Sequence, residues 1–232
     1  MKAYIIALTD FNYSITHARS MQEKLLSYGI NASIFPAIEG DIAALEFIKE
    51  NRLPDSEFAH KNYKGILHYD FLCYTGIKGA FASHYKCWEI CANLHEPIFI
   101  FEDDVIFTKS YIHFDFNDVL LVSIDKQFIK KWYLDYKFLL KHSENDYTVD
   151  YIGEHIPSAS GYLIKPHAAQ KLLERYKNTY DSPDHCIHSG LLDIKVLRNP
   201  IGYALNETHN KISATKDFEF AKSFKMQPNI TY

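Results

Sequence analysis

Apolar residues recur along the chain with two periods, one typical of strands and one typical of helices. In the N-terminal part, short apolar runs and stretches with one apolar helical face follow one another. The elements predicted there are a strand over 2–8, a helix over 14–28 that Gly29 closes, a strand over 31–35 and a short helix marked by Ile42, Leu45 and Ile48. Strands that alternate with helices are typical of βαβ units, so the pattern predicts an α/β fold with a mostly parallel sheet flanked by helices.

The same two periods continue through the rest of the chain. Apolar residues at 77, 81, 85, 88, 91 and 94 predict a helix over 76–94, which ends before Pro97. The other predicted elements are a long loop over 51–75, a strand over 118–123, strands between 151 and 164, and a helix from Pro166 to Tyr176.

The most informative stretch is 97–107, where four apolar residues run directly into three carboxylates. Residues 98–101 show no alternation, which is typical of a strand buried on both faces. In open α/β sheets the ligand binds beyond the carboxyl ends of the strands, so the acids are expected at a ligand site. Strand alternation predicts that Glu102 and Asp104 point to one side and Asp103 to the other.

Carboxylates that converge need a positive charge between them, because each otherwise raises the pKa of the others. Mg²⁺ or Mn²⁺ suits ligands that are all oxygen and leaves coordination positions for substrate phosphates. The acidic stretch therefore predicts a divalent metal site. The plain alternative is an acidic strand end that is only solvated.

Composition and charge narrow the class of protein. The chain of 232 residues fits one domain, and 47% hydrophobic with 23% charged residues is typical of a globular protein. A net charge of −4 gives no overall reason to expect a nucleic-acid or anionic-membrane partner. We expect a single domain over 1–232 with a flexible tail from about 220, and no membrane span or secretion signal. The expected location is the cytoplasm, with the inner face of the membrane as the alternative.

The four cysteines show no C-x-x-C spacing, and we expect them to be small core residues rather than disulfide or zinc ligands. The cysteines are Cys73, Cys87, Cys91 and Cys186.

Six motifs stand in a fixed order along most of the chain. They are the first apolar strand with Thr9 and Arg19 after it, Phe35-x-Ala37-x-x-Gly40 with Glu39, Gly76-x-x-Gly79 with Ser83-His84, the triplet Glu102-Asp103-Asp104, Gly161-Tyr162, and Pro183-Asp184. This order resembles glycosyltransferase family 25, which includes lipopolysaccharide and collagen galactosyltransferases. The first turn differs, since Thr9-Asp10-Phe11 stands where the family usually shows Asn-Leu-Asp.

The resemblance implies a GT-A-like, Rossmann-like fold and an inverting transfer of a sugar from a nucleotide-sugar donor, in the first place a UDP-sugar. It also implies roles for individual residues. Asp104 is the expected direct ligand of Mn²⁺ or Mg²⁺, with Glu102 and His209 as further ligands, and Asp184 is the expected catalytic base. The residues expected to contact the donor are Thr9, Arg19, Glu39, His84, Glu102 and Asp103.

A basic and aromatic stretch over 125–142 is the candidate acceptor surface, and a solvated helix face is its plain interpretation. Its candidate residues are Lys130, Lys131, Trp132 and Tyr136. The leading acceptor is a glycan such as lipooligosaccharide, and the alternative is hydroxymethylated cytosine in phage DNA, where lysines would meet phosphates.

Two further classes of protein stay open at this point. A noncatalytic metal- or nucleotide-binding module would need the acidic triplet but no base. A nuclease or phosphotransferase could use the same acids, but the chain has no second clear acidic cluster and no Gly-rich phosphate loop.

Overall fold

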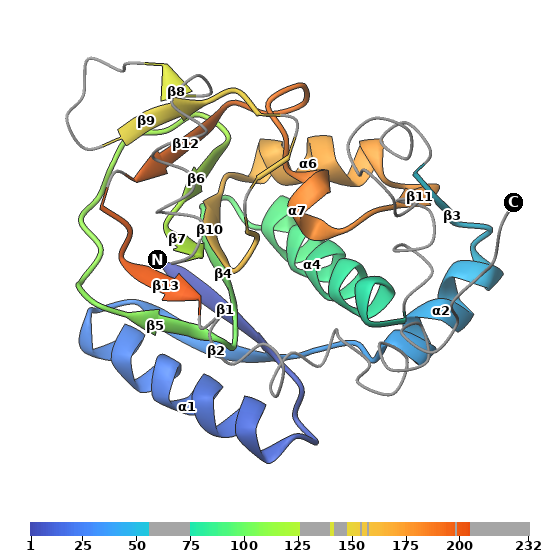
Figure 1. Ribbon diagram of the computed structural model, residues 1–232, viewed down its shortest axis with the longest axis horizontal. Coiled ribbons are helices and arrows are strands. Elements are labelled where there is room, and N and C mark those ends of the chain that lie inside the picture. The colour runs from blue at the N-terminus through green and yellow to red at the C-terminus, as the bar shows by residue number, and fades with distance from the viewer. Residues whose placement is uncertain are drawn as a thin grey trace, which may run out of the picture.

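The computed structural model describes residues 1–55, 75–125, 140–141, 148–153, 155–156, 158–197 and 199–204. The chain is built around an eight-stranded sheet with helices on both faces (Figure 1). In spatial order its strands are β2 (Asn31–Pro36), β1 (Lys2–Ala7), β4 (Ile98–Glu102), β10 (Gly161–Ile164), β6 (Val119–Leu121), β12 (Ile194–Leu197), β9 (Thr148–Tyr151) and β8 (Leu140–Lys141). Two small sheets accompany it, one of β11 (Thr179–Tyr180) with β3 (Leu53–Pro54) and one of β5 (Val105–Phe107), β13 (Gly202–Ala204) and β7 (Ser123–Asp125).

Most strands of the large sheet point the same way. β1 is parallel to both β2 and β4, and β12 is parallel to β6. β10 is antiparallel to β4 and β6, and β9 is antiparallel to β12 and β8. The predicted α/β class with a mostly parallel sheet is confirmed, while the reversed strand β10 in its centre is a feature that the sequence pattern did not predict.

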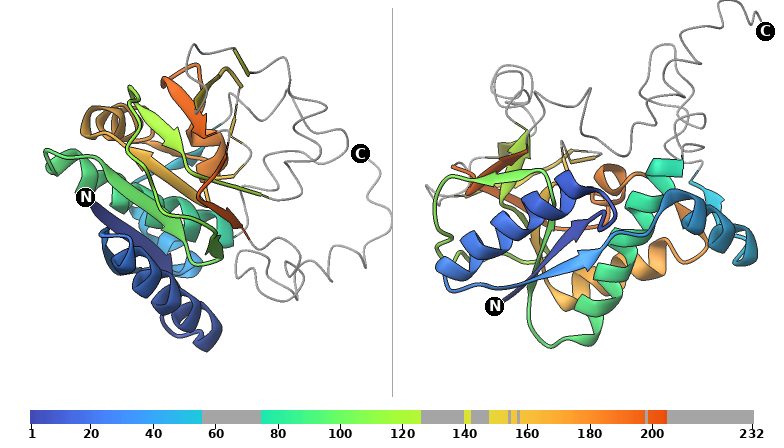
Figure 2. Two further views of the ribbon diagram at one scale, coloured as in Figure 1. Left: turned by 90° about the vertical axis from the view of Figure 1, so that its left-hand side faces the viewer. Right: turned by 90° about the horizontal axis from the view of Figure 1, so that it is seen from below.

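Helices cover the two faces of the sheet. α1 (Asn12–Ser27) packs on β1 and β2 on one face, and α4 (Thr75–Asn93) packs on the other face beside α6 (Pro166–Arg175), with α2 (Gly40–Lys49) against α4. Figure 2 shows α1 apart from α4 and α6. A one-turn helix, α7 (Pro183–Cys186), contacts α4.

The alternation of side chains along β4 divides the interior into two hydrophobic clusters. Ile98 and Ile100 join the cluster that contains the buried residues of α4 and α6, whereas Phe99 and Phe101 join the cluster of α1. All four side chains are fully buried. Because burying such a side chain stabilises the fold by about 1.5–3 kcal/mol, β4 is a major contributor to both clusters. The prediction of a strand buried on both faces is confirmed.

Helix α2 forms where a short helix was predicted, but with the opposite face buried. Ile42, Leu45 and Ile48 are exposed, and the buried side chains are Ala43 and Phe47. Ala43 and Phe47 are four residues apart and therefore lie on one helical face, which packs against α4. The three apolar residues that marked the helix in the sequence thus lie outside the core.

Other boundaries also moved. The strand expected over 118–123 divides into β6 and β7, which belong to different sheets. Of the strands expected between 151 and 164, β10 forms within that range, while β9 ends at Tyr151. Most of the expected loop, 56–74, lies outside the described residues, as do 126–139 and everything after 204.

The described cysteines are core residues, as predicted. Cys87, Cys91 and Cys186 are buried free thiols. Burial raises the pKa of all three thiols, so they are inert at neutral pH. No helix in the described part of the chain is long and apolar enough to cross a membrane.

Candidate active site

The acidic triplet lies at the edge of the sheet where the parallel strands β1, β2 and β4 all end. Glu102 is the last residue of β4, and Asp103 and Asp104 form the turn that leads into β5. The turns after β1 and β2 open at the same edge, because parallel strands share their carboxyl ends.

Glu102 and Asp103 point to opposite faces of the sheet. Glu102 continues the face of Ile100 and meets His84 of α4, with 3.4 Å between His84 Nε2 and Glu102 Oε1. Asp103 faces α1, where the Ser14 hydroxyl donates a hydrogen bond to its carboxylate and His17 Nδ1 contacts its backbone carbonyl. Strand alternation thus holds for these two residues. That Asp104 points to the same side as Glu102 stays a prediction, because Asp103 and Asp104 both lie in the turn after β4.

Asp104 has a buried oxygen with no partner: its Oδ1 atom accepts no hydrogen bond from any described residue. Burial and the charges of Glu102 and Asp103 raise the pKa of the Asp104 carboxyl to about 8. Burial and the charge of Asp103 likewise raise the pKa of Glu102 to about 7. A nearby cation would favour the ionised form of both groups.

These residues fit a hard divalent cation in one particular way. Within the described residues no group of three His, Cys, Asp or Glu side chains could hold a metal ion. Mg²⁺ and Mn²⁺ often take one or two carboxylates and fill their remaining positions with water and substrate phosphates. The geometry therefore suits a metal that binds together with a phosphorylated substrate.

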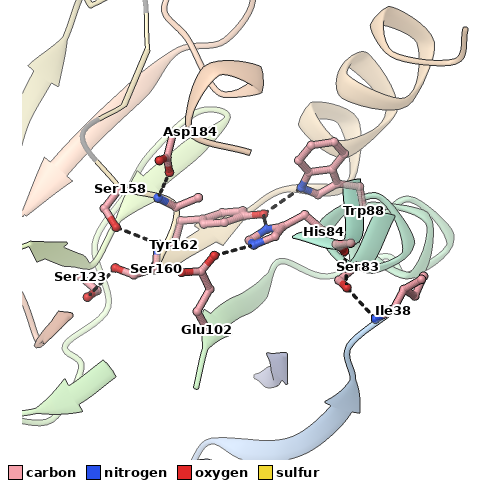
Figure 3. A network of polar contacts seen from close by, with 12 residues as sticks. Ile38, Ser83, His84, Trp88, Glu102, Ser123, Ser158, Ser160, Tyr162 and Asp184 are labelled. Atoms are coloured by element: carbon pink, nitrogen blue, oxygen red, sulfur yellow. Dashed lines mark hydrogen bonds and ion pairs between the residues drawn. The ribbon is translucent and has the colours of Figure 1, made fainter. Parts of the chain in front are cut away.

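Asp184 comes from a distant part of the chain, and it is close enough to Glu102 for their charges to interact (Figure 3). It is the second residue of α7, and its Oδ1 atom accepts a hydrogen bond of 2.5 Å from the backbone N–H of Ala159. Ser160, which follows Ala159, accepts a hydrogen bond of 2.8 Å from the backbone N–H of Glu102 through its carbonyl oxygen. Two adjacent residues thus hold Asp184 and Glu102. Burial and the charge of Glu102 raise the pKa of Asp184 to about 6, against the opposing charge of His185.

The Ser83-His84 pair has two separate tasks. The Ser83 hydroxyl donates to the Gly79 carbonyl at 2.7 Å and accepts the backbone N–H of Ile38 at 2.8 Å, which fixes the segment after β2 against α4. His84 instead faces Glu102 and Tyr162. Burial lowers the pKa of His84 to about 4, only partly offset by the Asp184 charge, so the imidazole is neutral at neutral pH.

The other residues expected at the site differ in their position. Thr9 and Glu39 are exposed in the turns after β1 and β2, at the edge that carries the acids. Arg19 is exposed in the middle of α1, about two helical turns from that edge. The expected metal ligand His209 and the expected acceptor residues lie outside the described residues; the latter are Lys130, Lys131, Trp132 and Tyr136.

Four residues of this region were not assigned to the site from the sequence. Ser14 and His17 are three residues apart on α1, so they lie on one helical face, and both reach Asp103. The sequence does not show this contact, because it depends on α1 starting at this edge of the sheet. Tyr162 and Trp88 are wholly buried and polar, and only the fold shows that they meet at His84.

The comparison with known proteins identifies a family. Residues 1–187 match the model of glycosyltransferase family 25, described as an LPS biosynthesis protein. The match covers the acidic triplet, His84 and Asp184. No curated protein matches the chain.

Proposed function

The chain belongs to glycosyltransferase family 25, and on that basis we propose that it is an inverting, metal-dependent transferase of the GT-A type. In this proposal it moves a hexose or pentose from a UDP-sugar to a hydroxyl of a glycan such as lipooligosaccharide. One observation carries the proposal: Asp184 and Glu102, more than 75 residues apart in sequence, lie close enough for the charge of Glu102 to raise the pKa of Asp184. A transferase needs both, since donor and acceptor must be activated side by side.

On the donor side, Asp104 and Glu102 would hold Mn²⁺ or Mg²⁺ together with the diphosphate of the donor. The metal, when bound, neutralises the charge that develops on the leaving diphosphate. The unpartnered Oδ1 atom of Asp104 supports this role. The exposed residues Thr9 and Glu39, at the same edge, are the proposed further donor contacts.

On the acceptor side, Asp184 would act as the base. It takes the proton of the acceptor hydroxyl while that oxygen forms a bond to the anomeric carbon. The bond from the anomeric carbon to the phosphate oxygen breaks, and its electron pair leaves with the diphosphate. A pKa of about 6 keeps Asp184 ionised at neutral pH and still basic enough to accept a proton. The Ala159 N–H holds Oδ1, and Oδ2 is the oxygen proposed to take the proton.

The test is transfer itself. The protein is incubated with a panel of nucleotide sugars and with lipooligosaccharide, in the presence of either Mn²⁺ or EDTA. The mass of the acceptor is then measured by mass spectrometry. With one nucleotide sugar of the panel, we expect the mass of the acceptor to rise by one sugar unit. This gain should disappear in EDTA. Full transfer in EDTA would contradict the metal role, and donor binding without transfer to any acceptor would favour a noncatalytic binding module.

The lysine-rich stretch that suggested a DNA acceptor lies outside the described residues, so that alternative stays a prediction. Including duplex DNA with hydroxymethylated cytosine in the panel tests it directly. Transfer to DNA that falls steeply with added salt would support it, because phosphate contacts release counterions.

A further inference from the structure

Three polar side chains lie at the centre of the hydrophobic cluster under the site. Trp88 and Tyr162 have no exposed surface, and His84 has 1%. Only a joint replacement of all three by apolar side chains would leave none of their hydrogen-bonding atoms unpaired, and burying a polar group costs free energy unless it is hydrogen-bonded. Their presence is therefore a cost that packing alone does not explain.

The three side chains form one chain of hydrogen bonds that ends at the site (Figure 3). Trp88 Nε1 donates to the Tyr162 hydroxyl at 2.8 Å, and the same hydroxyl lies 2.8 Å from His84 Nδ1. The other ring nitrogen of His84 lies 3.4 Å from Glu102 Oε1.

The chemistry of the groups sets the direction of this chain. An indole N–H only donates, so the Tyr162 oxygen accepts from Trp88 and has one hydrogen left to give. Its described partner is His84 Nδ1, which accepts that hydrogen if the buried ring is neutral. The hydrogen of the imidazole then sits on Nε2, where it faces the Glu102 carboxylate.

Regular structure places each member of the chain. His84 and Trp88 are four residues apart on α4 and so lie on one helical face. Tyr162 of β10 pairs with Ile100 of β4, and Glu102 is two residues beyond Ile100 on the same face of the sheet. The helix and the two strands thus fix the chain independently of any loop.

We propose that Trp88, Tyr162 and His84 are positioning residues for the donor site. Trp88 and Tyr162 lock His84 in its Nε2–H tautomer, and His84 thereby fixes the Glu102 carboxylate. Glu102 then holds its carboxylate in one orientation. The catalytic meaning of this chain rests on the proposed glycosyl transfer. Supporting groups of this kind typically change activity by about 10–100-fold when they are removed.

Two amide substitutions of His84 separate positioning from packing. In His84→Gln the amide nitrogen reaches roughly the place of Nε2 and still donates to Glu102. In His84→Asn the amide reaches only the place of Nδ1, so it keeps the contact with Tyr162 and loses Glu102. Both are buried amides of similar polarity, and Cys87→Ala, a buried change on the same helix, is the control for packing.

We expect kcat of His84→Gln to stay within a few-fold of the wild type, and kcat of His84→Asn to fall about 10–100-fold with KM for the acceptor unchanged. Tyr162→Phe should also lower kcat, because it frees the tautomer of His84. Equal losses in the Gln and Asn variants would overturn the proposal, as would a Cys87→Ala loss as large as that of His84→Asn.

A second measurement does not depend on transfer. In the wild-type protein with ¹⁵N-labelled histidine, NMR should show His84 with a protonated Nε2 and an unprotonated Nδ1 at neutral pH, and Tyr162→Phe should abolish that fixed pattern. The opposite tautomer in the wild type would refute the proposed direction of the chain even if transfer occurs. If the wild type transfers no sugar, the proposed function fails while this result still decides the hydrogen-bond chain.

Discussion

Replacing Asp184 by Asn tests the proposed base with little disturbance of the fold. The Asn side chain keeps an oxygen that can accept the backbone N–H of Ala159, which Asp184 now does at 2.5 Å. It loses the negative charge that Glu102 opposes across the site. The folded state should therefore be as stable as the wild type or slightly more stable, while the group that takes the acceptor proton is gone.

The expected loss follows from the role of a general base. Such a base contributes about 10²–10⁴-fold to the rate, which corresponds to about 2.7–5.4 kcal/mol in the barrier at about 1.36 kcal/mol per tenfold. We expect kcat to fall by that factor and the donor dissociation constant to change less than about threefold, because the base acts on the acceptor in the transition state.

The pH profile gives the same test a second readout. The pKa of Asp184 is about 6, so wild-type kcat/KM should fall about tenfold for each pH unit below 6, where the carboxylate becomes protonated. The Asp184→Asn profile should lack this acid limb. Initial rates are measured at saturating Mn²⁺ across pH, with the exposed Asp115→Asn as a charge-matched control. A variant that keeps more than about a tenth of wild-type kcat, or the same acid limb, would show that Asp184 is not the base.

Three other changes have defined outcomes. Without metal, the raised pKa of Asp104 means that the folded state becomes less stable as the pH rises from 3.8, the ordinary pKa of this carboxyl, to about 8. Asp104→Asn should flatten that decline in thermal melts. An unchanged slope would contradict the raised pKa of Asp104. Burial by itself raises the pKa of the Asp118 carboxyl, but hydrogen bonds from Lys171 and His167 of α6 and from the Asp193 backbone N–H outweigh burial and lower it. Asp118→Asn should therefore lower the free energy of unfolding by about 1.5–3 kcal/mol at neutral pH, and the difference from the wild type should shrink as acid protonates Asp118. Gly79→Ala would place Cβ 2.6 Å from the Ile38 carbonyl oxygen and should destabilise by about 1–3 kcal/mol, unlike Gly190→Ala, whose nearest contact is a side-chain atom at 3.1 Å.

Local periodicity was enough to predict the elements whose burial pattern is set along one segment. The apolar run of β4 and the helical spacing of α4 correspond to side chains that are buried in the structure. For α2 it located the helix but not the buried face, because three exposed apolar residues formed a clearer pattern than the two that pack. It also could not show that β10 inserts in reverse between β4 and β6, since strand order depends on contacts between distant segments.

Part of the candidate site could also be predicted from the sequence. Three adjacent acids after a buried strand are costly enough to stand out in sequence. Asp184 entered only through the family resemblance, and its position beside Glu102 depends on the return of the chain through α6 to α7. Tyr162 and Trp88 look like ordinary core residues, because a hydrogen bond between a helix and a strand leaves no mark in either local pattern.

The structure also ranks the three acids as candidates for metal binding. Glu102 already accepts from His84, and Asp103 accepts from Ser14 on the other face of the sheet. Asp104 has a buried Oδ1 that no described residue contacts, and burial and its two neighbours raise its pKa to about 8. Leaving a buried carboxylate oxygen unpaired is expensive unless a ligand pairs it. Asp104 is therefore the acid whose burial cost a bound cation would relieve most.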